Sequence, residues 1–286
     1  MNEFEIFHLI YLIMISAISV IFIVHSILTR KKLTIKEATF NDYFREWLEH
    51  HDVKTPIEEI KGPLPPYLKS FFFAGKWYAR LGINANKVSI LGVIWGLWAL
   101  ECWFLGHTWI VLGVLFLILS GSTDSIDGVV AYLTDTETDL GAYYDAILDK
   151  FGDILWVLGP IYFIFTNSTA QATYSNFLLI TITVIGLMGL LLAIIQEYCR
   201  ARQQGLGLTE TKPVIGERIS RLGMFIIIYS CIGFSDLFTL LNPSPGFQNV
   251  NIWMHIYIIP ICFIVLLIFS IISIIQLNRH AVKYLK

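Results

Sequence analysis

Seven long apolar runs follow one another along the chain, separated by polar stretches of which the first, between residues 29 and 88, is much the longest. A helix that crosses a bilayer needs about 20 mainly apolar residues. The runs predict such helices over residues 8–29, 88–106, 109–131, 144–166, 175–198, 219–240 and 252–277. No soluble domain of any size remains between them, so the pattern predicts an all-α polytopic membrane protein.

Lysine and arginine lie on one side of this predicted topology. Short loops rich in these residues stay on the cytoplasmic side of a membrane. All 20 Lys and Arg fall within, or close to the helix ends that border, residues 30–87, 132–143, 199–218 and 278–286. We therefore predict an integral protein of a prokaryotic cell membrane, with these segments in the cytoplasm and the N-terminus outside.

The spans and linkers divide the chain into three predicted parts. Residues 1–30 are expected to form an N-terminal transmembrane anchor, residues 31–83 a cytoplasmic linker, and residues 84–286 a six-helix membrane domain. In the linker, residues 36–61 are polar and charged. Residues 67–82 interleave basic and aromatic side chains, which predicts an amphipathic helix in the membrane interface; a plain basic linker is the alternative.

The composition agrees with a membrane protein and argues against a nucleic-acid partner. Hydrophobic residues make up 56% of the chain, charged residues 15%, and the net charge is −2. A protein that binds nucleic acid usually carries a basic surface, which this chain lacks. The four cysteines are scattered without metal-ligand spacing, and we interpret them as packing residues.

Four aspartates interrupt the apolar sequence. Asp124 and Asp127 lie at the predicted cytoplasmic end of one span, and Asp145 and Asp149 near the start of the next. Spacings of three and four residues place each pair on one helix face. Four carboxylates within a membrane are costly unless a cation lies among them, and all-oxygen sites suit hard cations. We predict two divalent ions, Mg²⁺ or Mn²⁺; solvated polar helix ends are the alternative.

Small residues accompany these acids. Gly128, Ala131 and Gly141 leave room for a ligand to approach closely. Residues 124–149 read D-x-x-D-G-x-x-A-Y-x8-G-x-x-x-D-x-x-x-D. This resembles the signature of the CDP-alcohol phosphotransferase (CDP-alcohol phosphatidyltransferase) family at seven of its eight fixed positions and at every spacing. The exception is Tyr132, where the family has arginine.

The resemblance implies a six-helix membrane enzyme that displaces CMP from a CDP-lipid, either CDP-diacylglycerol or CDP-archaeol, by the hydroxyl of a polar alcohol. It implies that Asp124, Asp127 and Asp145 bind metal, and that Asp149 lies at the same metal site and takes the acceptor's proton. The stretch "NANKVSILG" is similar to the family's P-N-x-V-T, with Ala85 in place of Pro and Ser89 in place of Thr. The residues implied at the nucleotide site are Asn86, Gly128, Ala131, Tyr132 and Gly141. The family also suggests a homodimer.

A third matching region contains a group of arginines. "EYCRARQQGLGL" and "GERISRLG" resemble loop sequences of the prokaryotic and archaeal phosphatidylinositol-phosphate synthase branch, where arginines receive the phosphate of a phosphorylated inositol. Arg200, Arg202, Arg218 and Arg221 occupy the corresponding places. Guanidinium groups suit bidentate phosphate binding, so the resemblance implies inositol phosphate as an acceptor. The positive-inside rule alone would also place arginines here, and both explanations stay open.

Two further readings compete with the enzyme. A catalytically silent relative that only binds nucleotide or lipid would explain Tyr132, because tyrosine cannot supply the charge of the family's arginine. A carboxylate-lined cation transporter ranks third. Its acids would have to line a path open to both sides of the membrane, whereas the four aspartates are predicted to lie at one side. Asp153, one turn beyond Asp149, is interpreted either as a support for the metal site or as a packing residue.

Overall fold

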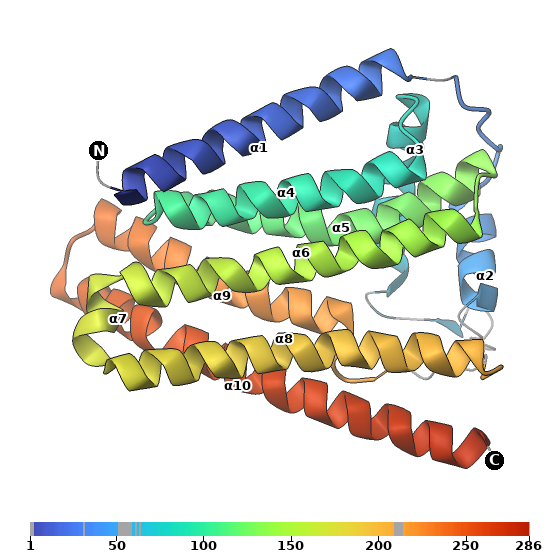
Figure 1. Cartoon of the computed structure of the whole chain (residues 1–286). Coiled ribbons are helices and arrows are strands. Elements are labelled where there is room, and N and C mark those ends of the chain that lie inside the picture. The colour runs from blue at the N-terminus through green and yellow to red at the C-terminus, as the bar shows by residue number, and fades with distance from the viewer. Residues whose placement is uncertain are drawn as a thin grey trace. The chain divides into compact units, whose positions relative to one another are not determined.

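The chain folds into α-helices throughout the part that the structure describes. The computed structural model describes residues 3–30, 32–50, 59–60, 62, 64–208 and 214–285, and these ranges contain no strand. This confirms the predicted all-α fold. The helices, labelled in Figure 1, are α1 (Glu3–Leu28), α2 (Phe40–His50), α3 (Leu64–Arg80), α4 (Ala85–Leu105), α5 (Trp109–Thr134), α6 (Asp139–Thr166), α7 (Ser168–Thr173), α8 (Asn176–Gly205), α9 (Arg218–Leu241) and α10 (Pro245–Tyr284).

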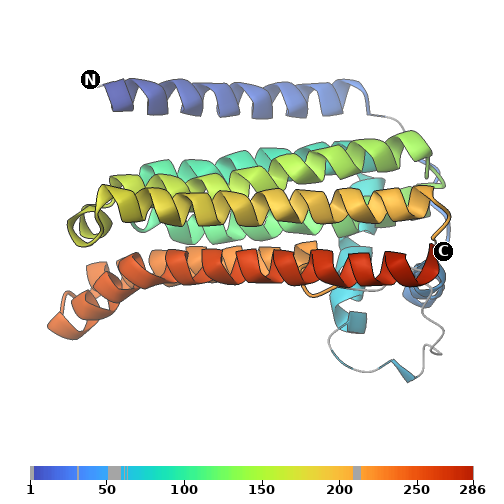
Figure 2. The same cartoon turned by 60° about the horizontal axis from the view of Figure 1, so that its bottom comes forward.

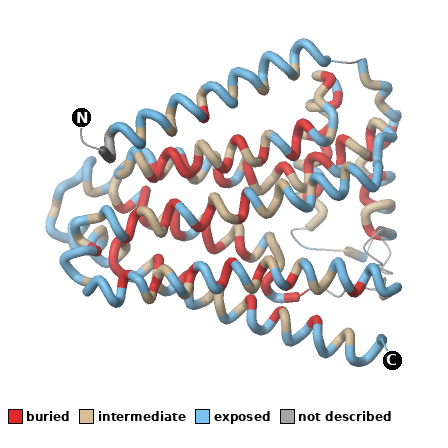
Figure 3. Tube along the Cα trace, viewed as in Figure 1, coloured by how far each residue is buried: buried red, intermediate tan, exposed pale blue. Residues whose placement is uncertain are grey.

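Six of these helices are long and apolar enough to cross a membrane. They are α1 (from Ile6), α4, α5, α8, α9 and α10, judged by length and composition among the described residues. The side chains of α1 are exposed along most of its length (Figure 3). A helix that is apolar on every side is typical of a membrane span, because lipid can cover all of its faces.

Helix α6 corresponds to the predicted span over residues 144–166, but it does not belong to these six. Its 28 residues give a length of about 42 Å, enough to cross a bilayer. Its cytoplasmic part, as predicted from the sequence, carries Asp145, Asp149, Lys150 and Asp153, however, so α6 is not apolar enough over the length that a span requires. The described part of the chain thus contains six candidate spans by composition and a further helix, α6, that is long enough to span but carries charge.

The described residues divide into two compact units. The first contains residues 1–95 and 119–152, and the second contains residues 96–118 and 153–286. Each unit has its own buried core and is considered separately below. The predicted division at residues 30 and 83 remains a prediction; residues 31, 51–58, 61 and 63 of the predicted linker lie outside the described ranges.

In the first unit, the linker that was predicted as a polar stretch contains a helix, α2. Thr39 and Asp42 cap its start reciprocally: the Thr39 amide donates to Asp42 Oδ2 at 2.9 Å, and the Asp42 amide to Thr39 Oγ1 at 3.3 Å. Apolar side chains then recur on one helix face and pack against α3 and α5: Phe40, Tyr43, Phe44, Trp47 and Leu48. The predicted amphipathic helix over residues 67–82 is confirmed as a helix by α3, which begins three residues earlier.

The second unit is built around a continuous aromatic and aliphatic core. Helix α10 packs along α8 and α9, as Figures 1 and 2 both show. The fully buried Trp103 forms edge contacts with Tyr229 at 4.9 Å and Phe163 at 5.3 Å between ring centroids. These aromatic pairs stabilise the packing of α4, α6 and α9 beyond the area that they bury.

Gly159 allows α6 to approach Trp103 closely within this core. A Cβ atom at this position would overlap the indole ring. We expect Gly159→Ala to destabilise the protein by about 1–3 kcal/mol, because an overpacked core must shift side chains or backbone. Thermal unfolding in detergent, followed by tryptophan fluorescence, measures this change.

Gly223→Ala on α9 is the matched control. A Cβ atom there would meet nothing within 4 Å, so alanine should leave stability unchanged or raise it by up to about 1 kcal/mol. Equal unfolding temperatures for Gly159→Ala and the wild type would contradict the close packing of α6 on Trp103.

Candidate metal centre

The four predicted site aspartates all belong to the first unit, at the adjoining ends of α5 and α6. Asp124 and Asp127 lie in the last three turns of α5, and Asp145 and Asp149 in the first three turns of α6. Helix α5 ends at Thr134, and the next residue, Asp135, has a left-handed φ of 53°, a conformation that aspartate tolerates better than most residues. A connection of four residues, 135–138, then reverses the chain and brings the two acidic helix ends together.

Three of the four carboxylates converge. One oxygen each from Asp124, Asp145 and Asp149 lies within 4.8 Å of the others. Mg²⁺ holds oxygen ligands at about 2.0–2.1 Å, so opposite ligands lie about 4 Å apart, and Ca²⁺ tolerates wider sites. The spacing and the all-oxygen donor set therefore fit a hard divalent cation after small side-chain rotations.

Asp127 lies beside this group and has different partners. Ser89 Oγ donates to Asp127 Oδ2 at 2.5 Å, and the Gly128 amide donates to Asp127 Oδ1 at 2.7 Å. The side chain is buried, within electrostatic reach of Asp145 and Asp124. The hydrogen bonds hold Asp127 in a fixed orientation against α4, and its place among the metal ligands remains a prediction.

Among the predicted small residues, Gly128 leaves open space near the acids, whereas Gly141 is closely packed. A Cβ atom at Gly128 would meet nothing within 4 Å. At Gly141 it would lie 3.1 Å from Thr138 Oγ1 and 3.4 Å from Asn86 Oδ1. The structure thus brings Asn86 and Gly141 together, as two residues of one ligand pocket require. Ala131 is half-buried on the same stretch of α5.

Tyr132, the residue that departs from the motif, is buried and packs against the N-terminal part of the chain. Its ring lies 5.3 Å from the Tyr43 ring, centroid to centroid, and Lys36 Nζ lies 4.5 Å above it. The Lys36 amide donates to the Leu133 carbonyl at 2.8 Å. The residues that share this cluster are Ala38, Tyr43, Phe72, Val129, Tyr132 and Leu133. We call residues 35–48 the docking segment.

Tyr43 links the docking segment to the acids. Burial raises the pKa of its phenol, and the nearby carboxylates of Asp127, Glu137 and Asp124 raise it further. Tyr43 therefore lies within electrostatic reach of the aspartate cluster. Tyr43 was not among the residues predicted from the sequence, although an apolar spacing signals its helix face: Phe40, Tyr43, Phe44, Trp47 and Leu48.

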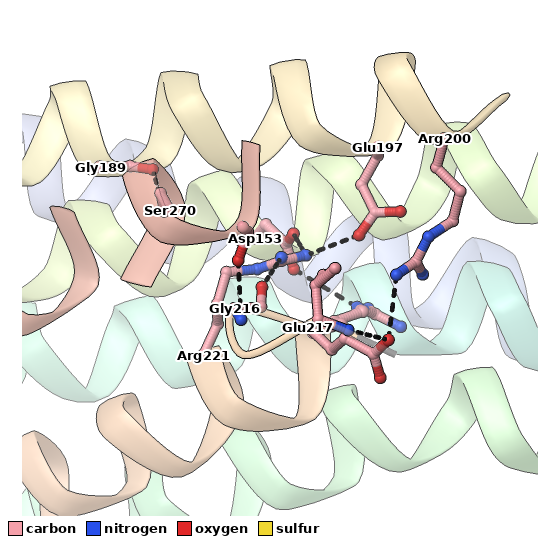
Figure 4. Close-up of polar contacts among 11 residues, drawn as sticks. Asp153, Gly189, Glu197, Arg200, Gly216, Glu217, Arg221 and Ser270 are labelled. Atoms are coloured by element: carbon pink, nitrogen blue, oxygen red, sulfur yellow. Dashed lines mark hydrogen bonds and ion pairs between the residues drawn. The ribbon is translucent and has the colours of Figure 1, made fainter. Parts of the chain in front are cut away.

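The predicted acceptor arginines belong to the second unit, where three of them contact carboxylates (Figure 4). Arg218 Nε lies 3.3 Å from Asp153 Oδ1, and a terminal nitrogen of Arg221 lies 3.1 Å from Asp153 Oδ2. The same nitrogen of Arg221 lies 3.3 Å from Glu197 Oε1. The sequence singled out Asp153 as a metal-site support or a packing residue, and the structure assigns it to this ion-pair network.

Arg200, the third arginine that contacts a carboxylate, and Arg202 are more accessible than Arg218 and Arg221. Arg200 lies 3.0 Å from Glu217 Oε1, and 22% of its side chain is exposed. Arg202 is exposed on the following turn of α8. Glu197 and Glu217 were missed as partners, because nothing in their local sequence indicates which arginine they approach. Residues 209–213 of the predicted cytoplasmic loop lie outside the described ranges.

Comparison with known proteins gives one family and one relative. The model of the CDP-alcohol phosphatidyltransferase family matches residues 83–261, more than half of the chain. An uncharacterized protein of Aquifex aeolicus is 27% identical over 131 residues. This alignment covers 46% of the present chain and 61% of the relative, less than two thirds of its length. The family match includes all four aspartates and all four arginines, whereas the docking segment precedes it.

Proposed function

The chain belongs to the CDP-alcohol phosphatidyltransferase family, and on that premise we propose that it transfers a phosphatidyl-type group from a CDP-lipid to a polar alcohol and releases CMP. The family implies a transferase that acts on a CDP-alcohol in a membrane. The observation that supports this proposed reaction is the convergence of Asp124, Asp145 and Asp149 within one motif of 26 residues. Phospholipid biosynthesis is the corresponding cellular role.

The proposed reaction is a displacement at the phosphorus that carries the lipid. The acceptor oxygen forms a bond to this phosphorus, the bond to the bridging oxygen of CMP breaks, and the acceptor's proton passes to an oxygen of Asp149. Mg²⁺ or Mn²⁺, held as two ions by Asp124, Asp127, Asp145 and Asp149, would neutralise the diphosphate and make CMP a better leaving group.

The other residues of the first unit would hold the donor. Gly128, Ala131, Gly141 and Asn86 border the space in which the cytidine nucleotide is proposed to lie. The absence of a side chain at Gly128 supports this assignment, because the backbone can approach a nucleotide closely there. CDP-diacylglycerol and CDP-archaeol remain the proposed donors, and the site is proposed to open to the cytoplasm.

The acceptor is proposed to be inositol phosphate or another polar alcohol bound near Arg200, Arg202, Arg218 and Arg221. Arg200 and Arg202 are the accessible members of this set. Arg221, by contrast, is buried between two carboxylates, which supports a structural role for it alongside any role in binding. A homodimer remains an expectation from the family resemblance.

A silent relative that binds nucleotide without turnover is the second candidate. Tyr132 favours it, because an uncharged side chain that packs against the docking segment occupies the position of the family's arginine. CDP binding without CMP release from any CDP-lipid would support this second reading.

Removal of divalent cations tests the enzyme proposal. We expect the purified protein to release CMP from CDP-diacylglycerol or CDP-archaeol with Mg²⁺ or Mn²⁺ and with one of the acceptors inositol phosphate, glycerol phosphate and serine. An excess of EDTA should abolish release, because the carboxylates alone would repel the diphosphate, and added Mg²⁺ should restore it. Failure to release CMP with any donor and acceptor, despite bound metal, would refute the transfer reaction.

A further inference from the structure

The docking segment lies outside the part of the chain that the family model matches, yet it packs on the motif itself. The match begins at residue 83, and residues 35–48 precede it. Two of the residues that the segment contacts, Tyr132 and Leu133, follow the motif's Ala131 directly on α5. The segment therefore touches the helix end that carries Asp124 and Asp127.

The contact is built from both backbone and side chains. The Lys36 amide bonds to the Leu133 carbonyl at 2.8 Å, which continues hydrogen bonding beyond the last turn of α5. Tyr43 is 7% exposed, Tyr132 is 6% exposed, and Phe72 of α3 contacts the Tyr43 ring at 5.7 Å. Between the Lys36 hydrogen bond and the Tyr43 ring contacts, the cap formed by Thr39 and Asp42 fixes the start of α2.

We infer that Tyr132 is a positioning residue, which anchors the docking segment over the motif end of α5 and makes this segment part of the catalytic unit. An arginine at this position would not keep the ring contacts that Tyr132 makes with Tyr43 and Lys36. A guanidinium placed among Ala38, Tyr43, Phe72, Val129 and Leu133 would lose its hydration without gaining a partner in that cluster.

The surroundings of the cluster support the same conclusion. An arginine at position 132 would have to turn toward the adjoining cavity of about 310 Å³, which is lined by Asp42 and Glu46. It would then leave the Tyr43 ring without its neighbour and place a second cation beside Lys36. Tyr43 would lose its fixed position within reach of Asp124 and Asp127.

The effect on docking can be measured without any substrate. We expect Tyr132→Arg to increase hydrogen–deuterium exchange in residues 35–48 by about tenfold or more, because local opening becomes easier when the anchor is lost. Tyr132→Phe should keep the protection, since the ring contacts remain. Tyr143→Arg, the same change at an exposed site on α6, should leave exchange in the docking segment unchanged.

The effect on catalysis rests on the proposed function. In an active wild type, Tyr132→Arg should lower kcat/KM for CMP release by about tenfold, although it restores the family's residue, and Tyr132→Phe should stay within about twofold. Unchanged or higher activity in Tyr132→Arg, or unchanged exchange, would overturn the inference. If the wild type releases no CMP, the proposed function fails. The inference about Tyr132 is then decided by comparing the wild type with Tyr132→Arg in hydrogen–deuterium exchange of residues 35–48 and in affinity for CDP with Mg²⁺.

Discussion

Asp149→Asn is expected to lower CMP release by about 10²–10⁴-fold, the range that a positioned general base contributes to a reaction. The amide keeps the shape of the side chain but cannot accept the acceptor's proton. It also weakens the group of Asp124, Asp145 and Asp149, whose oxygens lie within 4.8 Å of one another. Initial rates of CMP formation at saturating donor and acceptor measure the loss.

Asp149 has two proposed roles, metal ligand and general base, and activity measured over a range of Mg²⁺ concentrations distinguishes them. If it only binds metal, high Mg²⁺ should restore much of the rate, as we expect for Asp124→Asn. If it is also the base, the rate should stay low at every Mg²⁺ concentration. Asp139→Asn, the same change at an exposed acid in the first turn of α6, is the matched control and should keep wild-type activity. An Asp149→Asn protein within about tenfold of wild type would exclude this residue as the base.

The aspartate cluster was predictable because its geometry is mostly local. Helical spacing places Asp124 near Asp127 and Asp145 near Asp149, and a connection of four residues joins the two helix ends. The convergence of Asp145 and Asp149 with Asp124 follows from these two facts. The separate hydrogen bonding of Asp127 does not, since it depends on Ser89, which is 38 positions away in the sequence.

Helix ends were predicted less well than the spans, for a physical reason. Hydropathy marks the part of a helix that lipid can surround, whereas hydrogen bonding continues into polar sequence. Helix α6 thus begins at Asp139, five residues before the predicted run, and α10 extends from Pro245 to Tyr284, beyond the predicted residues 252–277. Polar residues at these ends remain helical because they still complete the backbone hydrogen bonds.

The docking segment contains a helix signal that its many charged residues obscure. The charge of residues 36–61 concealed an apolar spacing of three and four residues from Phe40 to Leu48. The Thr39 and Asp42 pair was a start signal for the same helix. That this helix packs on Tyr132, however, is a contact between segments almost 90 positions apart, and no local pattern predicts it.

Arg221→Met is expected to destabilise the second unit by about 3–5 kcal/mol, the usual cost of removing one partner from a buried ion pair. Arg221 is 2% exposed, and its other terminal nitrogen donates to the Gly216 carbonyl at 2.7 Å. The change would leave Asp153, which is 3% exposed, without its contact to Arg221, while Arg218 Nε still lies 3.3 Å from Asp153 Oδ1. Unfolding by SDS in mixed micelles measures the loss.

Arg202→Met is the control, because Arg202 is exposed on α8 and its replacement should leave stability within about 0.5 kcal/mol of wild type. The comparison separates two roles for the buried arginine. If Arg221 serves mainly to bind the phosphate of an acceptor, Arg221→Met should unfold like the wild type and raise the KM for that acceptor. If it serves mainly to neutralise Asp153 and Glu197, stability should fall whichever acceptor is used, because Asp153 keeps its buried charge when the guanidinium is gone.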